Sequence, residues 1–241
     1  MAVKELWLVR HGESVGNAAA TGAELDGLDR IPLETRDADV VLSPTGVEQA
    51  EALGVWLSEH RSAIDIYWVS PYVRARQTLA TALGDEGPPV AVIVDERLRD
   101  RELGILDLLT SHGVARLHPE EAERRRHLGK FYHRPPGGES WADVALRLRS
   151  FLLDASATSG ETALVVAHDA IVMLFLYLMV PMDERQLLDF AAANTVLNAS
   201  VTHVVRSDDG WKLVQFSSVE HLVKDGAEVT VHPGHPDVQP E

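Results

Sequence analysis

The stretch Leu8-Val9-Arg10-His11-Gly12-Glu13-Ser14 decides how the rest of the sequence is interpreted. The apolar run from Leu6 to Val9, which leads into this stretch, predicts a β-strand that runs directly into a basic pair and a glycine. In open α/β sheets, ligands bind outside the carboxyl ends of the strands. We therefore expect Arg10 and His11 at a ligand-binding edge.

Further short apolar runs alternate with helical patterns along the chain, which favours an α/β fold. The expected strands are Ile64–Val69, Val90–Val94, Thr162–Ala167, Thr202–Arg206 and Lys212–Ser217. The first three are apolar on both faces, as a covered central sheet requires. The last two flank Asp208-Asp209-Gly210, a good hairpin turn. We expect a three-layer sandwich, with helices on both faces of a mostly parallel sheet and a C-terminal edge hairpin.

Helices are expected between these strands. Thr45 is a candidate N-cap for a helix reaching about His60, and Glu48 would complete a capping box. Ser140 is a candidate N-cap for a helix reaching about Ala157. The remaining expected helices are Val73–Leu83, Glu120–Leu128 and Ala170–Met179.

The chain shows no internal repeat and no dividing linker, so we expect a single domain over residues 1–223. Ala18–Asp39 is rich in Gly, Asp and Ala and is expected to form a long loop. With residues 105–137 it would supply a small helical and loop cap. Residues 224–241 contain Pro233, Pro236 and Pro240 and are expected to be a flexible or loosely docked tail.

Composition narrows the function. The 241 residues are 45% hydrophobic, enough for a sizeable core, and carry a net charge of −15. Such an acidic surface disfavours nucleic acid and anionic membranes as partners. The absence of cysteine excludes disulfide scaffolds and thiolate chemistry. The N-terminus lacks a signal-peptide pattern, and the longest apolar run, Ala170–Val180, is too short to span a bilayer. We expect a soluble cytoplasmic protein.

Three of the expected strands lead to basic residues. The first ends at Arg10-His11, the second continues through Ser70-Pro71 to Arg74, and the fourth ends at His168. Parallel neighbouring strands would bring these side chains into one crevice. An imidazole can attack phosphorus, and arginine binds phosphoryl oxygens in a bidentate manner. Gly12 would let a phosphate approach the backbone closely. The pattern predicts a phosphoryl-transfer site.

The motif around His11, with Asn17 after it, resembles the signature of the histidine phosphatase (phosphoglycerate mutase-like) superfamily. Supporting motifs follow in order: Leu42–Ala50, Ser70–Thr78, Gly138-Glu139-Ser140 and Val166-Ala167-His168. The resemblance covers roughly Leu6 to Val205. Arg-His-Gly alone is a weak signal, but the ordered set is specific.

The resemblance implies a role for each matching residue. His11 would be the phosphorylated nucleophile, with Arg10, Arg74 and His168 completing the phosphate pocket and Asn17 bordering it. The general acid would lie in Leu98–Gly104, where Asp100 stands at a position that is Glu in most relatives. We expect Asp100 to be the acid and keep Glu102 as its rival.

Several neighbouring residues have two interpretations. Arg74 and Arg76 lie two apart on a helix and face different ways, and the resemblance selects Arg74. Asp169 stands where relatives have Gly, and it would either orient His168 or cap the next helix.

Glu13 and Glu139 are expected to support the pocket by hydrogen-bonding loop amides. Arg124-Arg125-Arg126 would form a solvated face or, alternatively, recognise a second anionic group from the cap. The remaining histidines show no metal-ligand spacing, so we expect no catalytic metal and no cofactor. Tyr132 and Trp141 are candidates for the pocket wall or for a homodimer interface.

The superfamily contains phosphatases and cofactor-dependent mutases, and the mutases carry a Phe-x-Gly-Trp-like segment. The matching stretch, Gly22–Arg30, has no aromatic residue, whereas Arg126–Ser140 resembles a broad-specificity phosphatase branch. We expect a histidine acid phosphatase-type phosphomonoester hydrolase, acting on a small phosphorylated metabolite and releasing inorganic phosphate. The alternatives are a phosphoglycerate mutase and an inactive relative with a regulatory or binding role.

Overall fold

The computed structural model describes residues 3–85 and 87–232, and its strands form one six-stranded sheet. The strands are β1 (Glu5–Arg10), β2 (Ile66–Val69), β3 (Val92–Val94), β4 (Thr162–Ala167), β5 (Val201–Ser207) and β6 (Gly210–Ser218). Their order is β3-β2-β4-β1-β5-β6, parallel from β3 to β1 and antiparallel at β5 and β6. The expected mostly parallel sheet with a C-terminal edge hairpin is confirmed.

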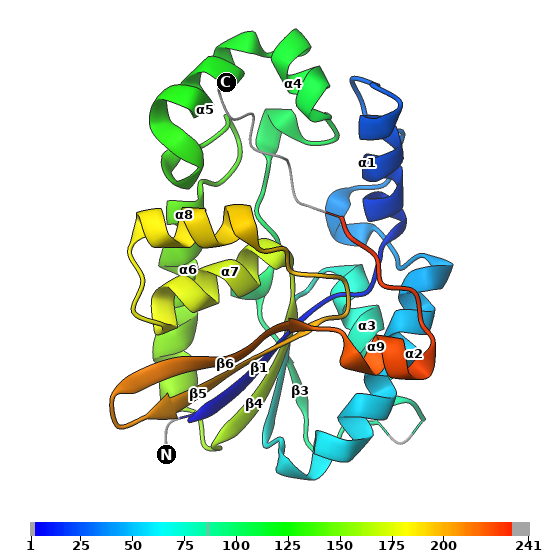
Figure 1. The fold of residues 1–241 in the computed structure, drawn as a ribbon, viewed down its shortest axis with the longest axis vertical. Helices are drawn as coiled ribbons and strands as arrows, with labels where there is room; N and C mark the ends of the chain where they lie inside the picture. Colours follow the sequence, from blue (N-terminus) through cyan, green and yellow to red (C-terminus); the bar gives the residue numbers. More distant parts are fainter. Residues whose placement is uncertain (1–2, 86, 233–241) are drawn as a thin grey trace.

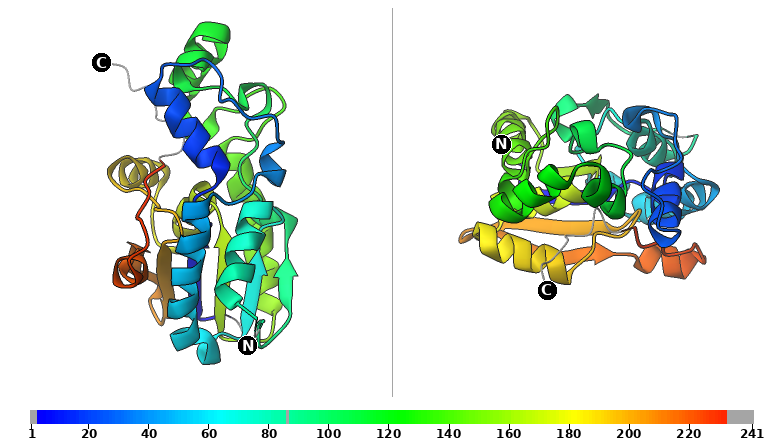
Figure 2. Two further views of the ribbon diagram at one scale, coloured as in Figure 1. Left: turned by 90° about the vertical axis from the view of Figure 1, so that its right-hand side faces the viewer. Right: turned by 90° about the horizontal axis from the view of Figure 1, so that it is seen from above.

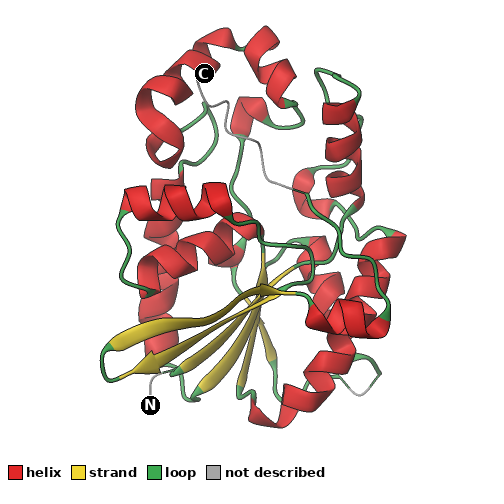
Figure 3. Ribbon diagram, in the orientation of Figure 1, coloured by secondary structure: helices red, strands yellow, loops and turns green. Residues whose placement is uncertain are grey.

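Helices cover both faces of this sheet (Figures 1 and 3). The α-helices are α1 (Val15–Leu25), α2 (Pro44–His60), α3 (Val73–Leu83), α4 (Ser111–Leu117), α5 (Pro119–Tyr132), α6 (Trp141–Ala157), α7 (Asp169–Met179), α8 (Glu184–Ala193) and α9 (Glu220–Asp225). Short 3-10 turns are η1 (Asp37–Asp39), η2 (Arg61–Ala63), η3 (Glu96–Leu98) and η4 (Gly104–Leu106). Within the described part of the chain, every helix is too short or too polar to cross a membrane.

The central strands are apolar on both faces because each face contacts a different set of helices. Side chains alternate along a strand, so Leu8 joins the core against α6 and α7, whereas Val9 joins the core against α2 and α3. Trp68 and Tyr67 on β2 divide in the same way. This two-sided burial fixes the register of β1 and hence the place where its last residue, Arg10, leaves the sheet.

Helices α1, α4 and α5 stand beyond the carboxyl ends of the parallel strands (Figures 1 and 2). The loop after α1 is attached to the segment before α4, because Thr110 N–H donates to the Asp29 carbonyl at 3.1 Å. Gly113 allows this approach, since a Cβ there would lie 1.9 Å from the Asp29 oxygen. The cap is therefore made from two distant stretches of sequence.

The expected N-cap of α2 was wrong by two residues. Ser43, and not Thr45, accepts the hydrogen bond from Gly46 N–H at 3.0 Å. Pro44 explains the earlier start, because its fixed φ suits the first helical position and its missing N–H costs nothing there. Glu48 consequently lies outside the capping position.

The expectation of a long loop over Ala18–Asp39 was also wrong in its first part. Helix α1 continues to Leu25, and only the remainder is irregular, with η1 near its end. The Ser14 side chain accepts from Asn17 N–H, while the Asn17 side chain accepts from Ser14 N–H. This capping box starts a helix that the following alanines favour.

Part of the expected tail is docked on the domain. Helix α9 ends at Asp225, and the Gln49 side chain then donates to the Glu228 carbonyl and to Thr230 at 2.8 and 2.9 Å. The His232 ring lies 2.6 Å from a carboxylate oxygen of Glu13. Residues 233–241, which hold the three prolines of the expected tail, lie outside the described residues.

Candidate active site

His11 lies immediately after β1 and is 3% exposed. Its Nδ1 is 2.7 Å from the Gly12 carbonyl oxygen and must donate to it, because a carbonyl can only accept. The other ring nitrogen, Nε2, accepts from Arg74 Nε–H at 3.2 Å. These two contacts define a neutral imidazole whose Nε2 lone pair faces the cationic side of the site.

The sharp turn after His11 depends on close backbone packing. A Cβ on Gly12 would lie 2.5 Å from the Gly46 carbonyl, and a Cβ on Gly46 would lie 1.9 Å from the Glu13 carbonyl. The start of α2 therefore presses against this turn. This contact with the Gly46 carbonyl is a sufficient reason for a glycine at position 12, in addition to the expected approach of a phosphate.

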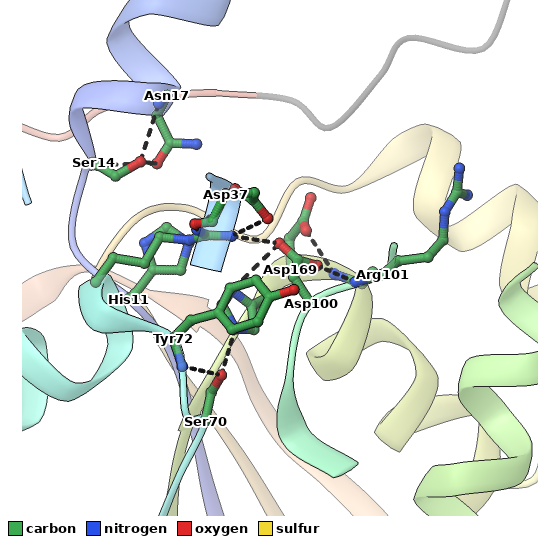
Figure 4. Close-up of polar contacts among 12 residues, drawn as sticks. His11, Ser14, Asn17, Asp37, Ser70, Tyr72, Asp100, Arg101 and Asp169 are labelled. Carbon is green, nitrogen blue, oxygen red and sulfur yellow. Dashed lines mark hydrogen bonds and ion pairs between the residues drawn. The ribbon is translucent and has the colours of Figure 1, made fainter. Parts of the chain in front are cut away.

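Arg74 lies in the first turn of α3, and every N–H group of its guanidinium has a hydrogen-bond acceptor. Its guanidinium donates to His11, to the carboxylate and carbonyl of Asp37, and to Asp100 Oδ2 at 3.1 Å (Figure 4). The side chain is 5% exposed. Arg76 is exposed, so the structure places Arg74 beside the histidine, as the motif implied.

His168 follows β4, the parallel neighbour of β1, and is fully buried. Ser70 Oγ accepts from Tyr72 N–H at 3.3 Å and forms a hydrogen bond with His168 Nε2 at 2.8 Å. The Nδ1 atom then faces Asp100 Oδ2, 3.3 Å away. The His11 and His168 ring centroids are 5.2 Å apart. Adjacent strand ends thus bring both histidines together.

Arg10 is the last residue of β1 and is 3% exposed. Its Nη atoms donate to the Val196 and His232 carbonyls at 2.5 and 3.1 Å. Its buried Nε has no hydrogen-bond partner among the described residues. Burial lowers the pKa of Arg10, and the carboxylates of Asp169 and Asp100 act in the opposite direction.

The two buried histidines are kept neutral by their surroundings. Burial is the largest cause that lowers the pKa of His11 well below its usual value, followed by the positive charge of Arg74. Burial and Arg74 lower the pKa of His168 in the same way. A neutral His11 is the form that can act as a nucleophile.

Asp100 and Glu102 occupy different positions. Asp100 Oδ2 contacts Arg74 and His168, and its Oδ1 accepts from Arg101 N–H at 2.8 Å. Glu102 is exposed and accepts from the Tyr72 hydroxyl at 3.0 Å. The geometry therefore favours Asp100 over Glu102 for proton transfer beside His11.

Glu13, Asn17 and Glu139 stabilise the loops around the site. Glu13 Oε1 accepts from Ser43 Oγ at 2.6 Å, and Asn17 completes the cap of α1. Glu139 accepts from Arg99, from Arg147 at two atoms, and from Glu102 N–H, which ties the segment that carries Asp100 to α6. Of these three side chains, Glu139 and Asn17 accept from backbone amides, whereas Glu13 accepts from the Ser43 hydroxyl.

Two undecided side-chain groups take ordinary structural positions. Asp169 begins α7, and its Oδ1 lies 2.7 Å from the Ala170 amide that donates to it. On α5, Arg124 pairs with Glu121, and Arg126 pairs with Glu123 at the helix surface. These pairs favour the solvated interpretation of the arginine run.

Sequence reasoning missed two contributors. Asp37 binds Arg74 from η1, and Asn198, before β5, donates to the His11 carbonyl at 3.2 Å. Neither lies in a strand-end motif, and the acidic run Arg36-Asp37-Ala38-Asp39 has the composition of an ordinary surface loop. In residues 3–85 and 87–232, no group of three or more acidic or histidine side chains is arranged to hold a metal ion.

Comparison with known proteins places this geometry in a family. The model of the histidine phosphatase superfamily, branch 1, matches residues 6–218. A 2,3-bisphosphoglycerate-dependent phosphoglycerate mutase from Sinorhizobium fredii is 30% identical over 197 residues, which cover 79% of this chain and 86% of that enzyme. The yeast fructose-2,6-bisphosphatase is 28% identical over 184 residues, and the match spans 75% of this chain but 36% of the yeast protein.

A similar solved structure is a mycobacterial glucosyl-3-phosphoglycerate phosphatase in complex with VO3. It has a TM-score of 0.68 and 25% identity, and the match covers 90% of this chain and all of that one. The chain belongs to the histidine phosphatase superfamily, branch 1. Its family and relatives support an enzyme of the phosphatase or mutase type.

The lowered pKa values of His11 and His168 predict how stability depends on pH. Between those values and the unfolded value of about 6.5, the unfolded chain binds protons that the folded chain does not. The free energy of unfolding should therefore fall as pH drops below about 6.5, by up to about 1.4 kcal/mol per pH unit for each histidine.

Replacing His11 with Gln should remove one such contribution and flatten the slope of unfolding free energy against pH, measured by denaturant titration between about pH 5 and 7. The matched control is His127→Gln on the exposed side of α5. Equal slopes in the wild type and His11→Gln would contradict a buried neutral His11.

Proposed function

We propose that this protein is a phosphomonoester hydrolase that acts through a phosphohistidine intermediate on a small phosphorylated metabolite. The observation that carries the proposal is the fixed orientation of His11. Its Nδ1 is bound to the Gly12 carbonyl, and its Nε2 points to Arg74 with Asp100 and His168 alongside. This arrangement suits in-line attack on a phosphoryl group.

In the proposed first step, His11 Nε2 forms a bond to phosphorus while the bond from phosphorus to the ester oxygen breaks. Protonated Asp100 gives its proton to the departing oxygen, which leaves as an alcohol. Arg10 and Arg74 stabilise the charge on the phosphoryl oxygens. Binding requires Arg74 to exchange carboxylate contacts for phosphoryl contacts, and the Arg10 Nε–H is a second donor for them.

In the second step, the Asp100 carboxylate removes a proton from water, and the water oxygen attacks phosphorus. The bond between phosphorus and His11 breaks, inorganic phosphate leaves, and both residues return to their starting states. His168, neutral and bonded to Ser70, would contribute hydrogen bonding beside the phosphoryl group. We also propose a cytoplasmic location, with which the absence of cysteine is compatible.

A phosphoglycerate mutase is the second candidate, because curated mutases are about 30% identical to this chain. Against it, Gly22–Arg30 contains no aromatic residue. This segment forms the end of α1 and the turn that follows it. The intact set of His11, Arg10, Arg74 and His168 argues against an inactive relative.

Conversion of 3-phosphoglycerate to its 2-isomer, with and without 2,3-bisphosphoglycerate, separates the two candidates. We expect any turnover of 3-phosphoglycerate to release more phosphate than 2-isomer under both conditions, since the site lacks the mutase-like segment. Isomerisation well above phosphate release would identify a mutase. Both products are measured in the same reaction by coupled assay and phosphate detection.

His11→Ala should abolish both phosphate release from p-nitrophenyl phosphate and labelling of the protein by a 32P-phosphomonoester. The wild-type label should be lost in acid and kept in base, as a phosphoramidate requires. His133→Ala, in the cap, is the control for loss of a buried histidine elsewhere. Label that persists in His11→Ala would refute the assignment of the nucleophile.

Asp100→Asn should slow hydrolysis of an alkyl phosphate at least about 100-fold, and that of p-nitrophenyl phosphate much less. Nitrophenolate departs without a proton, whereas an alkoxide needs one. Glu102→Gln is the matched control, because Glu102 contacts Tyr72 and not the histidines. The two substrates are compared by kcat/KM. Equal losses for both substrates in Asp100→Asn, or a larger leaving-group effect in Glu102→Gln, would contradict the assignment.

A further inference from the structure

Asp37 is a carboxylate beside the proposed phosphate site that the proposed mechanism does not use. It approaches from η1, in the loop between α1 and α2, and its two oxygens lie 2.9 and 3.3 Å from the Arg74 guanidinium. Its backbone carbonyl also accepts from Arg74 Nη1 at 2.6 Å. Two separate parts of one residue therefore bind the arginine that the proposed function assigns to the phosphoryl group.

The guanidinium of Arg74 has no donor to spare in this arrangement. Its Nε–H goes to His11, Nη1 to the Asp37 carbonyl and Oδ1, and Nη2 to Asp37 Oδ2 and Asp100 Oδ2. A phosphoryl group bound through Nη1 and Nη2 would take the edge of the guanidinium that the Asp37 carboxylate occupies. The Asp37 backbone carbonyl is uncharged and does not compete with the phosphoryl group for the charge of Arg74. Its hydrogen bond can therefore hold η1 beside Arg74 after the Asp37 carboxylate is displaced.

The rim around Asp37 is acidic. The Tyr72 hydroxyl donates to Glu102 at 3.0 Å, and the Arg74 guanidinium that binds Asp37 and Asp100 lies 4.9 Å from the centroid of the Tyr72 ring. Burial and these three carboxylates raise the pKa of Tyr72. Burial, with Asp100 and Asp107, also raises the pKa of Asp37 against the opposing effect of Arg74. The entrance to the site thus concentrates negative charge.

Apart from Arg10 and Arg74, three basic side chains near the site, those of Arg36, Arg99 and Arg101, are directed elsewhere. Arg36 pairs with Asp39 in the same turn at 2.9 Å, and Arg99 pairs with Glu139 at 2.7 Å. Arg101 points away from the His11 cluster in Figure 4, and its charge acts on His133 in the cap. A second anionic group next to the scissile phosphate would therefore meet carboxylates first.

We propose that Asp37 is a specificity-determining residue, which makes the site select phosphomonoesters with neutral or cationic groups next to the phosphate and reject those with a neighbouring carboxylate or second phosphate. This inference rests on the proposed function. It also gives a physical reason for phosphatase over mutase chemistry, because phosphoglycerates carry a carboxylate close to the phosphate.

Glycerol 3-phosphate and 3-phosphoglycerate form a matched pair of probes, because a hydroxymethyl group in one replaces a carboxylate in the other. Binding is measured by calorimetry in the His11→Ala background, where the probes cannot be turned over. We expect tighter binding of glycerol 3-phosphate. Asp37→Asn should reduce that preference about tenfold, as expected for removal of one like charge at short range. Asp37→Glu should retain most of it.

Asp39→Asn is the control variant, since Asp39 lies in the same turn but pairs with Arg36. It should leave the preference unchanged. Two results would overturn the inference: an unchanged preference in Asp37→Asn, or equal weakening of both probes, which would mean that Asp37 only positions Arg74. Phosphate release from p-nitrophenyl phosphate by the wild type tests the proposed function separately, so either proposal can fail while the other stands.

Discussion

The buried guanidinium of Arg74 is the constraint on which the rest of the site depends. A buried arginine must find acceptors for its five N–H groups, because an unpaired buried charge costs several kcal/mol, on the order of 3–5. Here the acceptors come from three places: His11 after β1, Asp37 in η1, and Asp100 after η3. One side chain thereby fixes the relative positions of His11, the cap loop and the segment that carries Asp100.

The same charge also shapes the chemistry of the histidines. Two imidazoles placed at the ends of adjacent parallel strands would repel each other if both were charged. Burial and the positive charge of Arg74 lower the pKa of both His11 and His168, so that the neutral form of each is favoured. The Gly12 carbonyl and the Ser70 hydroxyl then settle which nitrogen faces the site. Electrostatics and hydrogen bonding therefore hold His11 neutral and in one orientation, with Nε2 facing Arg74.

Loops outside the sheet supply further contacts to the side chains at the strand ends. The strand ends bring together Arg10, His11 and His168, and a similar fold occurs in a mycobacterial phosphatase. The loop that carries Asp37 reaches Arg74 from outside the sheet, and Glu139 with Arg147 holds the Asp100 segment against α6. Selectivity in this enzyme is expected to reside in these loops, because they surround the group attached to the phosphate.

The sequence by itself determined the sheet, its covering helices and the convergence of Arg10, His11, Arg74 and His168, because apolar periodicity and strand-end motifs are local signals. Asp100 was also reachable, through the position of its motif. Only the tertiary structure brought Asp100, rather than Glu102, next to Arg74 and His168, brought Asp37 and Asn198 to the site, and docked residues 226–232. Those outcomes depend on contacts across long stretches of chain, where the need to pair a buried charge outweighs local preference.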